Sequence, residues 1–208
     1  MGQVTALNIV SQPAPADVLP GYVVNDLLID FSGQYTGSQM VVALTSGSIY
    51  QNTSPLGSRT PPPAAAIPIE PALQWDTFVA NGGPTAETTI GQFLIGRGEI
   101  CAHCFPIEDE NTFTDESIDQ TWSPAGGNVI LDQTGFMVAR VTLSDDANGL
   151  LQYLGSADQI IGVGQPGRIE MLPIRNGFIV PEPSTVGLLV VACAAVVAVQ
   201  TRSPLAPG

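Results

Sequence analysis

The sequence predicts an all-β fold. We expect a single β-sandwich or jelly-roll domain over residues 1–178, followed by a C-terminal segment, residues 179–208, that contains a hydrophobic helix. Short runs of apolar and β-branched residues are separated by Gly, Pro, Asn and Asp, a pattern typical of strands and turns. Sustained helical periodicity occurs only in the C-terminal segment. The 208 residues suffice for one core and are too few for two ordinary domains.

Alternation between apolar and polar positions places the individual strands. The strand at residues 136–143 is expected to direct four side chains toward the core: Met137, Ala139, Val141 and Leu143. The complete set of predicted strands is residues 22–31, 40–44, 48–50, 73–79, 136–143, 150–154, 160–163, 168–172 and 178–180.

Turn residues indicate how these strands are connected. Ser46-Gly47 predicts a hairpin after residues 40–44, and the polar residues 145–149 predict a second hairpin after residues 136–143. Two longer loops are expected. Residues 52–71 are rich in proline, and residues 108–120 are acidic and solvated.

The charge composition excludes several classes of function. Acidic residues outnumber basic ones by 19 to 6, which gives a net charge of −13, and every basic residue is arginine. A nucleic-acid partner is not expected, because no cationic stripe is available for phosphates. The lack of lysine also excludes Walker-type phosphate binding and Schiff-base chemistry.

Cys101 and Cys104 form the first chemical candidate. A Cys-x-x-Cys pair supplies only half of a four-ligand zinc site, and His103 is the single histidine of the chain. In an oxidising compartment we expect a local disulfide between them. Free thiols, a metal site and a redox role remain the alternatives.

Other candidates have weaker patterns. Residues 162–167 match G-x-G-x-x-G, but a strand follows instead of a helix, so we interpret them as a turn. Acidic residues gather in two loops without EF-hand spacing, and we predict neither a metal nor a cofactor. The acidic positions considered are Asp109, Asn111, Asp115, Asp119, Asp145, Asp146 and Asn148.

Enzymatic activity is not expected. No G-x-S-x-G motif occurs, although a glycosidase would need only two carboxylates. Aromatic side chains that could stack on sugars are Tyr22, Tyr35, Trp75 and Trp122, with Trp75 expected in the core by alternation.

The C-terminal segment carries the most specific signal. Val180 precedes Pro181-Glu182-Pro183-Ser184-Thr185, and an uncharged apolar run, residues 186–199, leads to Arg202. The two prolines hold the tripeptide in an extended form. The run is shorter than the roughly 20 residues that a comfortable membrane span requires. An ordinary short anchor and a buried core helix are the alternatives to a sorting signal.

These residues resemble the PEP-CTERM sorting domain of exported bacterial proteins. The resemblance covers about residues 179–202. It implies recognition of Pro181, Glu182 and Pro183 by an exosortase-type membrane processing enzyme, with Arg202 as the terminal base and transient membrane insertion of the tail. It also implies a location at the cell surface or in the extracellular matrix, where exopolysaccharide is a possible partner.

The sequence therefore predicts a secreted structural or adhesive protein that is processed at its C-terminal signal. The alternatives are a carbohydrate-binding module and a glycoside hydrolase acting on extracellular polysaccharide. Residues 1–8 lack the charged and apolar regions of a secretory signal peptide. We therefore expect an in-frame start further upstream that encodes one.

Overall fold

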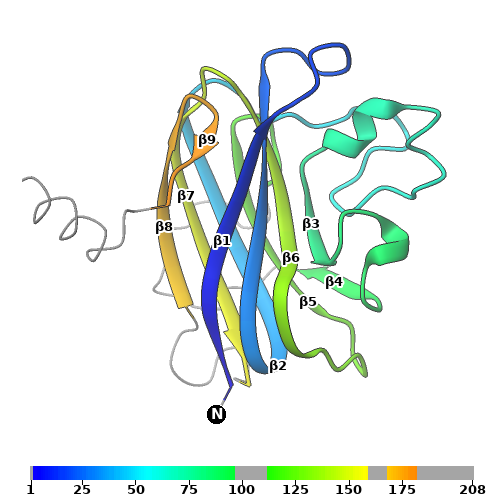
Figure 1. Ribbon diagram of the computed structural model, residues 1–208, viewed down its shortest axis with the longest axis vertical. Helices are drawn as coiled ribbons and strands as arrows, with labels where there is room; N and C mark the ends of the chain where they lie inside the picture. The colour runs from blue at the N-terminus through cyan, green and yellow to red at the C-terminus, as the bar shows by residue number, and fades with distance from the viewer. Residues whose placement is uncertain (1, 97–111, 159–167, 182–208) are drawn as a thin grey trace, which may run out of the picture.

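The computed structural model describes residues 2–96, 112–158 and 168–181. These residues form one curled antiparallel sheet with two short 3₁₀ helices (Figure 1), so the all-β prediction is confirmed. The predicted C-terminal helix lies outside the described residues. The strands are β1 (Gln3–Pro13), β2 (Tyr22–Ser46), β3 (Phe78–Gly82), β4 (Phe93–Gly96), β5 (Ser117–Pro124), β6 (Leu131–Ser144), β7 (Asn148–Ala157), β8 (Arg168–Arg175) and β9 (Phe178–Ile179).

Strand β2 belongs to both halves of the sheet. Its first part pairs with β1 and β6, and its second part pairs with β5 and β7. Figure 1 shows β2 running down one side and returning up the other. We call the strands β1-β2-β6-β3 the first half-sheet and β4-β5-β2-β7-β8-β9 the second half-sheet.

The bend in β2 is built around Gly33. This residue has a φ of +77°, and a Cβ there would lie 2.5 Å from a carboxylate oxygen of Asp158. The Asp158 carboxylate accepts the backbone N–H groups of Gln34 and Gly2, each at 2.7 Å. A residue with a side chain would displace this carboxylate, so the turn requires glycine at position 33.

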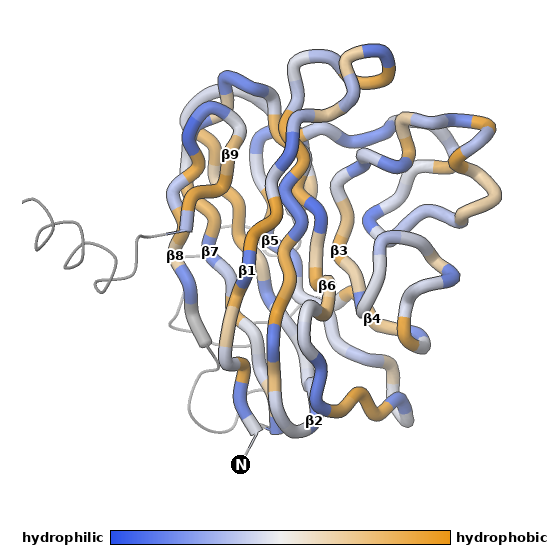
Figure 2. Tube along the Cα trace, in the orientation of Figure 1, coloured by the Kyte–Doolittle hydropathy of each residue, from blue (hydrophilic) through white to orange (hydrophobic). Residues whose placement is uncertain are grey.

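The apolar core lies between the half-sheets. Both contribute fully buried side chains, among them Leu27 and Val141 from the first and Leu151 and Trp122 from the second. The Trp122 indole N–H donates to the Ala80 carbonyl at 3.0 Å, which joins β5 to β3 across the core. Figure 2 shows the apolar and polar positions that alternate along the strands. Each fully buried aliphatic side chain contributes roughly 1.5–3 kcal/mol.

A second interior lies on the outer side of the first half-sheet. Residues 47–93 carry the helices η1 (Pro71–Trp75) and η2 (Ala86–Thr88) and cover this side. As a result β6 is buried on both faces over residues 136–143. We call the side chains between residues 47–93 and the first half-sheet the outer layer.

Several strand predictions are confirmed. Residues 22–31 and 40–44 both lie in β2, residues 150–154 in β7, residues 168–172 in β8, and residues 178–180 coincide with β9 to within one residue. Residues 52–71 contain no strand, as expected of the proline-rich loop. Residues 160–163 lie outside the described residues.

Both predicted hairpins are wrong. Strand β6 does not pair with β7; the connection at residues 145–149 crosses from the first half-sheet to the second, and each strand pairs with β2 instead. Residues 48–50 do not pair with β2, because Ile49 forms an isolated bridge with Leu143 of β6. Turn residues mark a change of direction without fixing which strands become neighbours.

Three other predictions also need correction. The start of residues 73–79 is the helix η1, whose proline at the first turn favours helix over strand, and β3 begins only at Phe78. The expected loop at residues 108–120 gives way to β5 at Ser117. Strands β1 and β4 were not predicted, since β1 has little alternation and β4 is only four residues long.

Candidate functional site

The predicted sorting signal begins where the described sheet ends. Strand β9 pairs with β8, and the Val180 N–H then donates to the Pro173 carbonyl at 2.9 Å. Pro181, the next residue, is exposed. The first residue of the predicted motif is thus the first residue beyond the sheet's hydrogen bonds. Glu182, Pro183 and Arg202 lie outside the described residues.

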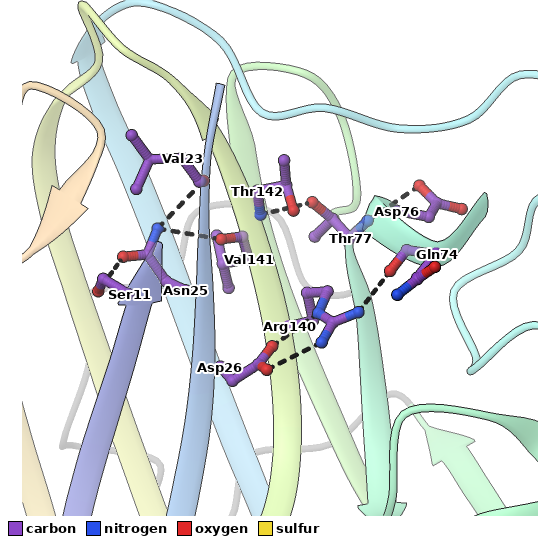
Figure 3. Close-up of polar contacts among 10 residues, drawn as sticks. All are labelled: Ser11, Val23, Asn25, Asp26, Gln74, Asp76, Thr77, Arg140, Val141 and Thr142. Atoms are coloured by element: carbon purple, nitrogen blue, oxygen red, sulfur yellow. Dashed lines mark hydrogen bonds and ion pairs between the residues drawn. The ribbon is translucent and has the colours of Figure 1, made fainter. Parts of the chain in front are cut away.

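A buried asparagine anchors this end of the sheet. Asn25 of β2 has no exposed surface, and its amide nitrogen donates to the carbonyls of Gly177 at 2.9 Å and Val141 at 3.1 Å. Its amide oxygen accepts the Ile179 N–H at 3.1 Å and the Ser11 hydroxyl at 2.7 Å. Figure 3 shows the contacts to Ser11 and Val141. Because one side chain ties β9 to the first half-sheet, the chain leaves the domain from a fixed point.

Arg140 forms the centre of the outer layer. Its guanidinium makes a two-point ion pair with the Asp26 carboxylate, at 2.6 and 2.8 Å, and donates to the Gln74 carbonyl (Figure 3). It also lies over the rings of Trp75 and Phe78, 5.8 and 5.6 Å from their centroids. The Arg140 side chain is only 8% exposed. The ion pair, the carbonyl acceptor and the two aromatic rings together supply the contacts that a buried arginine needs.

Asp76 joins the proline-rich loop to the same layer. One of its carboxylate oxygens accepts the N–H groups of Asn52 at 2.8 Å and Thr77 at 2.9 Å. Burial raises the pKa of the Asp76 carboxyl to about 6, against the effect of these hydrogen bonds. Asn52 also donates to Glu70 at 2.7 Å, and hydrogen bonds from Ser54 and Asn52 lower the pKa of that carboxyl. These contacts hold loop backbone in place, which is a structural use of both carboxylates.

The aromatic candidates divide into two groups. Tyr35 and Trp122 are fully buried, so the expectation that they stack on sugars is wrong. Tyr22, Tyr50 and Trp75 are partly exposed and pack together against the outer layer. The rings of Tyr22 and Tyr50 meet edge to face, with centroids 5.5 Å apart and planes at 65°. This geometry differs from the coplanar platform that a sugar ring would need.

The acidic loops are used by the fold itself. The Asp146 carboxylate accepts the Ser144 hydroxyl at 2.6 Å, and the Asp146 carbonyl accepts the Asn148 amide at 2.8 Å. Asp119 is buried and accepts the Gln39 amide at 3.3 Å. Within residues 2–96, 112–158 and 168–181, no three metal-binding side chains gather. Asp109, Asn111, Cys101, Cys104 and residues 162–167 lie outside the described residues, so the predicted disulfide stays a prediction.

One small cavity opens beside β4. It has a volume of about 270 Å³ and is lined by Thr60, Pro61, Ala86, Thr89, Gly91, Gln92, Phe93, Leu94 and Ala125. None of these side chains ionises near neutral pH. The described lining of the cavity therefore contains neither a carboxylate nor a histidine.

The sequence does contain a signal for the polar residues of the outer layer, namely charged residues inside apolar strands. The alternation of apolar and polar positions does not by itself identify them. Asp26 and Arg140 stand inside strongly apolar strands. A charged residue in such a strand must find a partner if both faces are buried. The two opposite charges, Asp26 and Arg140, are in fact directly opposed in the β2–β6 register. No residue pattern indicated that residues 47–93 would cover them.

Comparisons with protein-family models, curated proteins and solved structures found no match to this chain. Its function must therefore be inferred from the residues and their arrangement. Among the described residues there is also no helix with the length and apolar character of a membrane span.

Proposed function

We propose that this chain is a structural or adhesive protein of the cell surface or extracellular matrix, exported and then processed at a C-terminal sorting signal. The observation that carries the proposal is the junction at Pro181. The last hydrogen bond of the sheet is made by Val180, and Pro181 is already exposed. A processing enzyme needs an extended and accessible peptide, which is the form that the prolines of the motif favour.

The folded part is compatible with separation from its tail. Among the described residues, the core between the half-sheets extends to Ile179 and does not include Pro181. We propose that the curled sheet acts as one β-sandwich domain, with the apolar run after Pro183 as a separate helix. Removal of the tail would then leave every described core contact in place.

A non-enzymatic role fits the carboxylates of the outer layer. Asp76 is buried and accepts two backbone N–H groups, and Glu70 accepts the Asn52 side chain. Hydrolysis of a glycoside requires two carboxyl groups that face a substrate across a cleft. Both groups here are instead occupied in holding the loop.

The intact mass of the protein released from the cell surface tests the proposal. We expect the mature chain to end near residues 181–184 and to lack residues 186–202. The variant Pro181→Ala/Pro183→Ala should remain as a membrane-retained precursor, because the rigid extended handle is lost. Arg202→Glu should slow processing by disturbing the orientation of the tail.

A matched control separates recognition from general effects of losing proline. Pro55 and Pro63 are exposed prolines in the loop of residues 52–71, and Pro55→Ala/Pro63→Ala should be processed normally. A wild-type mass that includes the entire tail would refute the sorting proposal and favour a simple membrane anchor.

Binding of a neutral polysaccharide is the second candidate. Tyr22, Tyr50 and Trp75 are partly exposed and lie together, and Asn52 and Glu70 are close to Tyr50, whose pKa is raised by burial and by the charges of Asp76 and Glu70. The rings of Tyr22 and Tyr50 are not coplanar, so this candidate rests on a single partly exposed ring, Tyr50, beside these hydrogen-bonding groups. A net charge of −13 favours a neutral glycan over an anionic one.

Gel electrophoresis in the presence of dissolved polysaccharide tests this second candidate. Retardation of the wild type should be lost in Tyr50→Ala and kept in Phe178→Ala, which removes an aromatic ring that is 39% exposed on β9. Equal mobility of the wild type with and without neutral polysaccharides would rule the candidate out.

A further inference from the structure

The outer edge of β1 differs from the other edges of the sheet. Within the described residues β1 pairs only with β2, over almost its entire length from Gln3 to Pro13. It contains one irregularity, between Val4 and Ala6, and continues in regular register to Pro13. Since every second backbone group of an edge strand points away from its neighbour, β1 presents a row of backbone donors and acceptors.

The opposite edge of the first half-sheet is covered. There, the Val79 N–H donates to the Arg59 carbonyl at 3.0 Å, and the Asn81 carbonyl accepts the Ile90 N–H at 2.7 Å. Strand β4, at one edge of the second half-sheet, has four residues, and at the other edge the two-residue β9 covers only the end of the eight-residue β8. Short or covered edges are the usual protection against strand addition. Strand β1 has 11 residues, and within the described part of the chain no strand pairs with its outer edge.

The side chains of β1 are also unusual for this protein. The whole chain has a net charge of −13, yet residues 2–16 include no charged side chain. Charges on an edge strand normally prevent pairing with another strand. On the inner side, Leu7 and Ile9 pack against the core but stay partly exposed. On the outer side, Val10 is 53% exposed.

We propose that β1 is an assembly surface at which a second copy of this chain adds its own β1 in antiparallel orientation. In a two-fold pair, each side chain near the axis faces one from the same strand. A charged residue there would face its own copy and oppose association. Strand β1 has no charged side chain, so two copies can pair without repulsion even though the chain as a whole is strongly acidic. The same neutral strand would offer no charge to a partner that binds through charge complementarity.

The alternation of inward and outward side chains along β1 limits the registers in which two copies can pair. Leu7 and Ile9 point inward, whereas Asn8 and Val10 point outward. The two-fold axis must therefore pass through a residue position, such as Asn8 or Ile9. An axis midway between two residues would place the inward side chains of one copy opposite the outward side chains of the other. An axis on Asn8 pairs Leu7 of one copy with Ile9 of the other, and an axis on Ile9 pairs the two Ile9 side chains, so both registers bring apolar side chains together on the inner side. The two first half-sheets then form one continuous sheet, β3-β6-β2-β1 joined to the same four strands of the second copy.

Sedimentation of the full chain tests the proposal. We expect the wild type to dimerise with increasing concentration and Asn8→Lys/Val10→Lys to be at least about tenfold weaker, since like charges then meet near the axis in either register. The control Ile69→Lys/Val129→Lys adds the same charge at side chains that are 78% and 61% exposed elsewhere. It should dimerise like the wild type.

Two further measurements separate this interface from association through the tail or from misfolding. An equimolar mixture of Asn8→Lys/Val10→Lys with Asn8→Glu/Val10→Glu should form a mixed dimer, although neither variant pairs with itself. Amide hydrogen exchange in β1 of the wild type should slow as concentration rises. A wild type that stays monomeric, or a lysine variant that dimerises as well as the control, would overturn the proposal. Because all variants keep the tail, these outcomes do not depend on whether the sorting proposal is correct.

Discussion

Between the half-sheets, three hydroxyl groups form one polar contact. Ser38 lies 2.7 Å from the Tyr35 hydroxyl and 2.6 Å from the Tyr153 hydroxyl, and apolar side chains surround all three. Beneath residues 47–93, in contrast, a full ion pair between Arg140 and Asp26 organises the packing. The inner core is thus held mainly by burial of apolar surface. The outer layer, which attaches an irregular segment to a strand already buried on its other side, depends on directed polar contacts.

The largest effect is expected for Arg140→Met. This change removes the ion pair, the bond to Gln74 and the contacts with two rings, and it leaves the Asp26 carboxylate without a cation. We expect the free energy of unfolding in urea to fall by about 4–5 kcal/mol. Adding Asp26→Leu should recover part of the loss, because an apolar pair replaces the unpaired charge. A loss below about 1 kcal/mol would mean that the outer layer does not depend on this ion pair.

A somewhat smaller effect is expected in the inner core for Leu151→Ala. Leu151 is fully buried, and its truncation leaves a cavity between the half-sheets. We expect a loss of about 3–4 kcal/mol in the same unfolding experiment. The control Leu131→Ala, at a side chain that is 51% exposed, should change stability little. A similar loss for both variants would contradict the division into a buried core and an exposed strand start.

The smallest expected effect is a change of the unfolding free energy with pH, which arises from Asp76 in the outer layer. Burial raises the pKa of Asp76 from 3.8 to about 6, so the folded state holds this proton more tightly than the unfolded state. The contribution to stability is therefore complete below about pH 4 and is lost as pH rises to about 6. The total is at most about 3 kcal/mol, since one pKa unit corresponds to about 1.4 kcal/mol.

The difference in unfolding free energy between wild type and Asp76→Asn isolates this carboxyl. The pKa values of Asp158 and Glu87 are lowered by backbone hydrogen bonds and act in the opposite direction, but they are common to both proteins. We expect the wild type to lose stability relative to Asp76→Asn between about pH 4 and pH 6. A difference that stays constant over this range would show that Asp76 titrates normally.

The alternation of residues predicted the inner core well and the outer layer poorly. In the strand at residues 136–143, Ala139, Val141 and Leu143 face the core as expected, but Met137 packs in the outer layer. The cause is a register shift between β2 and β6, where Leu27 pairs with Ala139 and Leu28 with Met137. Such a bulge adds one residue and reverses the facing of those before it. Because this strand is apolar on both faces, the bulge does not change the alternation of apolar and polar residues in a recognisable way.

Local sequence patterns did not predict which strands pair with one another, and the reason is different. The turn at residues 145–149 has the composition of a hairpin but connects the two half-sheets. Strand pairing depends on which apolar faces meet across the core, and these contacts join residues far apart in the chain. The sorting motif stays a prediction. Among the described residues, its first proline follows the last strand, β9, since proline ends the hydrogen bonding of a strand edge.

The continuous strand β2 also has a consequence for how the protein folds. It lies next to β1, β5, β6 and β7, and its bonds reach as far as 154 residues along the chain, from Asn25 to Ile179. During synthesis β2 therefore emerges long before most of its neighbours exist. Contacts of such high sequence separation make folding slow, and an apolar strand that waits for its partners is open to misassociation. The pairing of β2 is expected to be complete only after β7 has been made, so that any step acting on the nascent chain before then meets β2 without all of its neighbours.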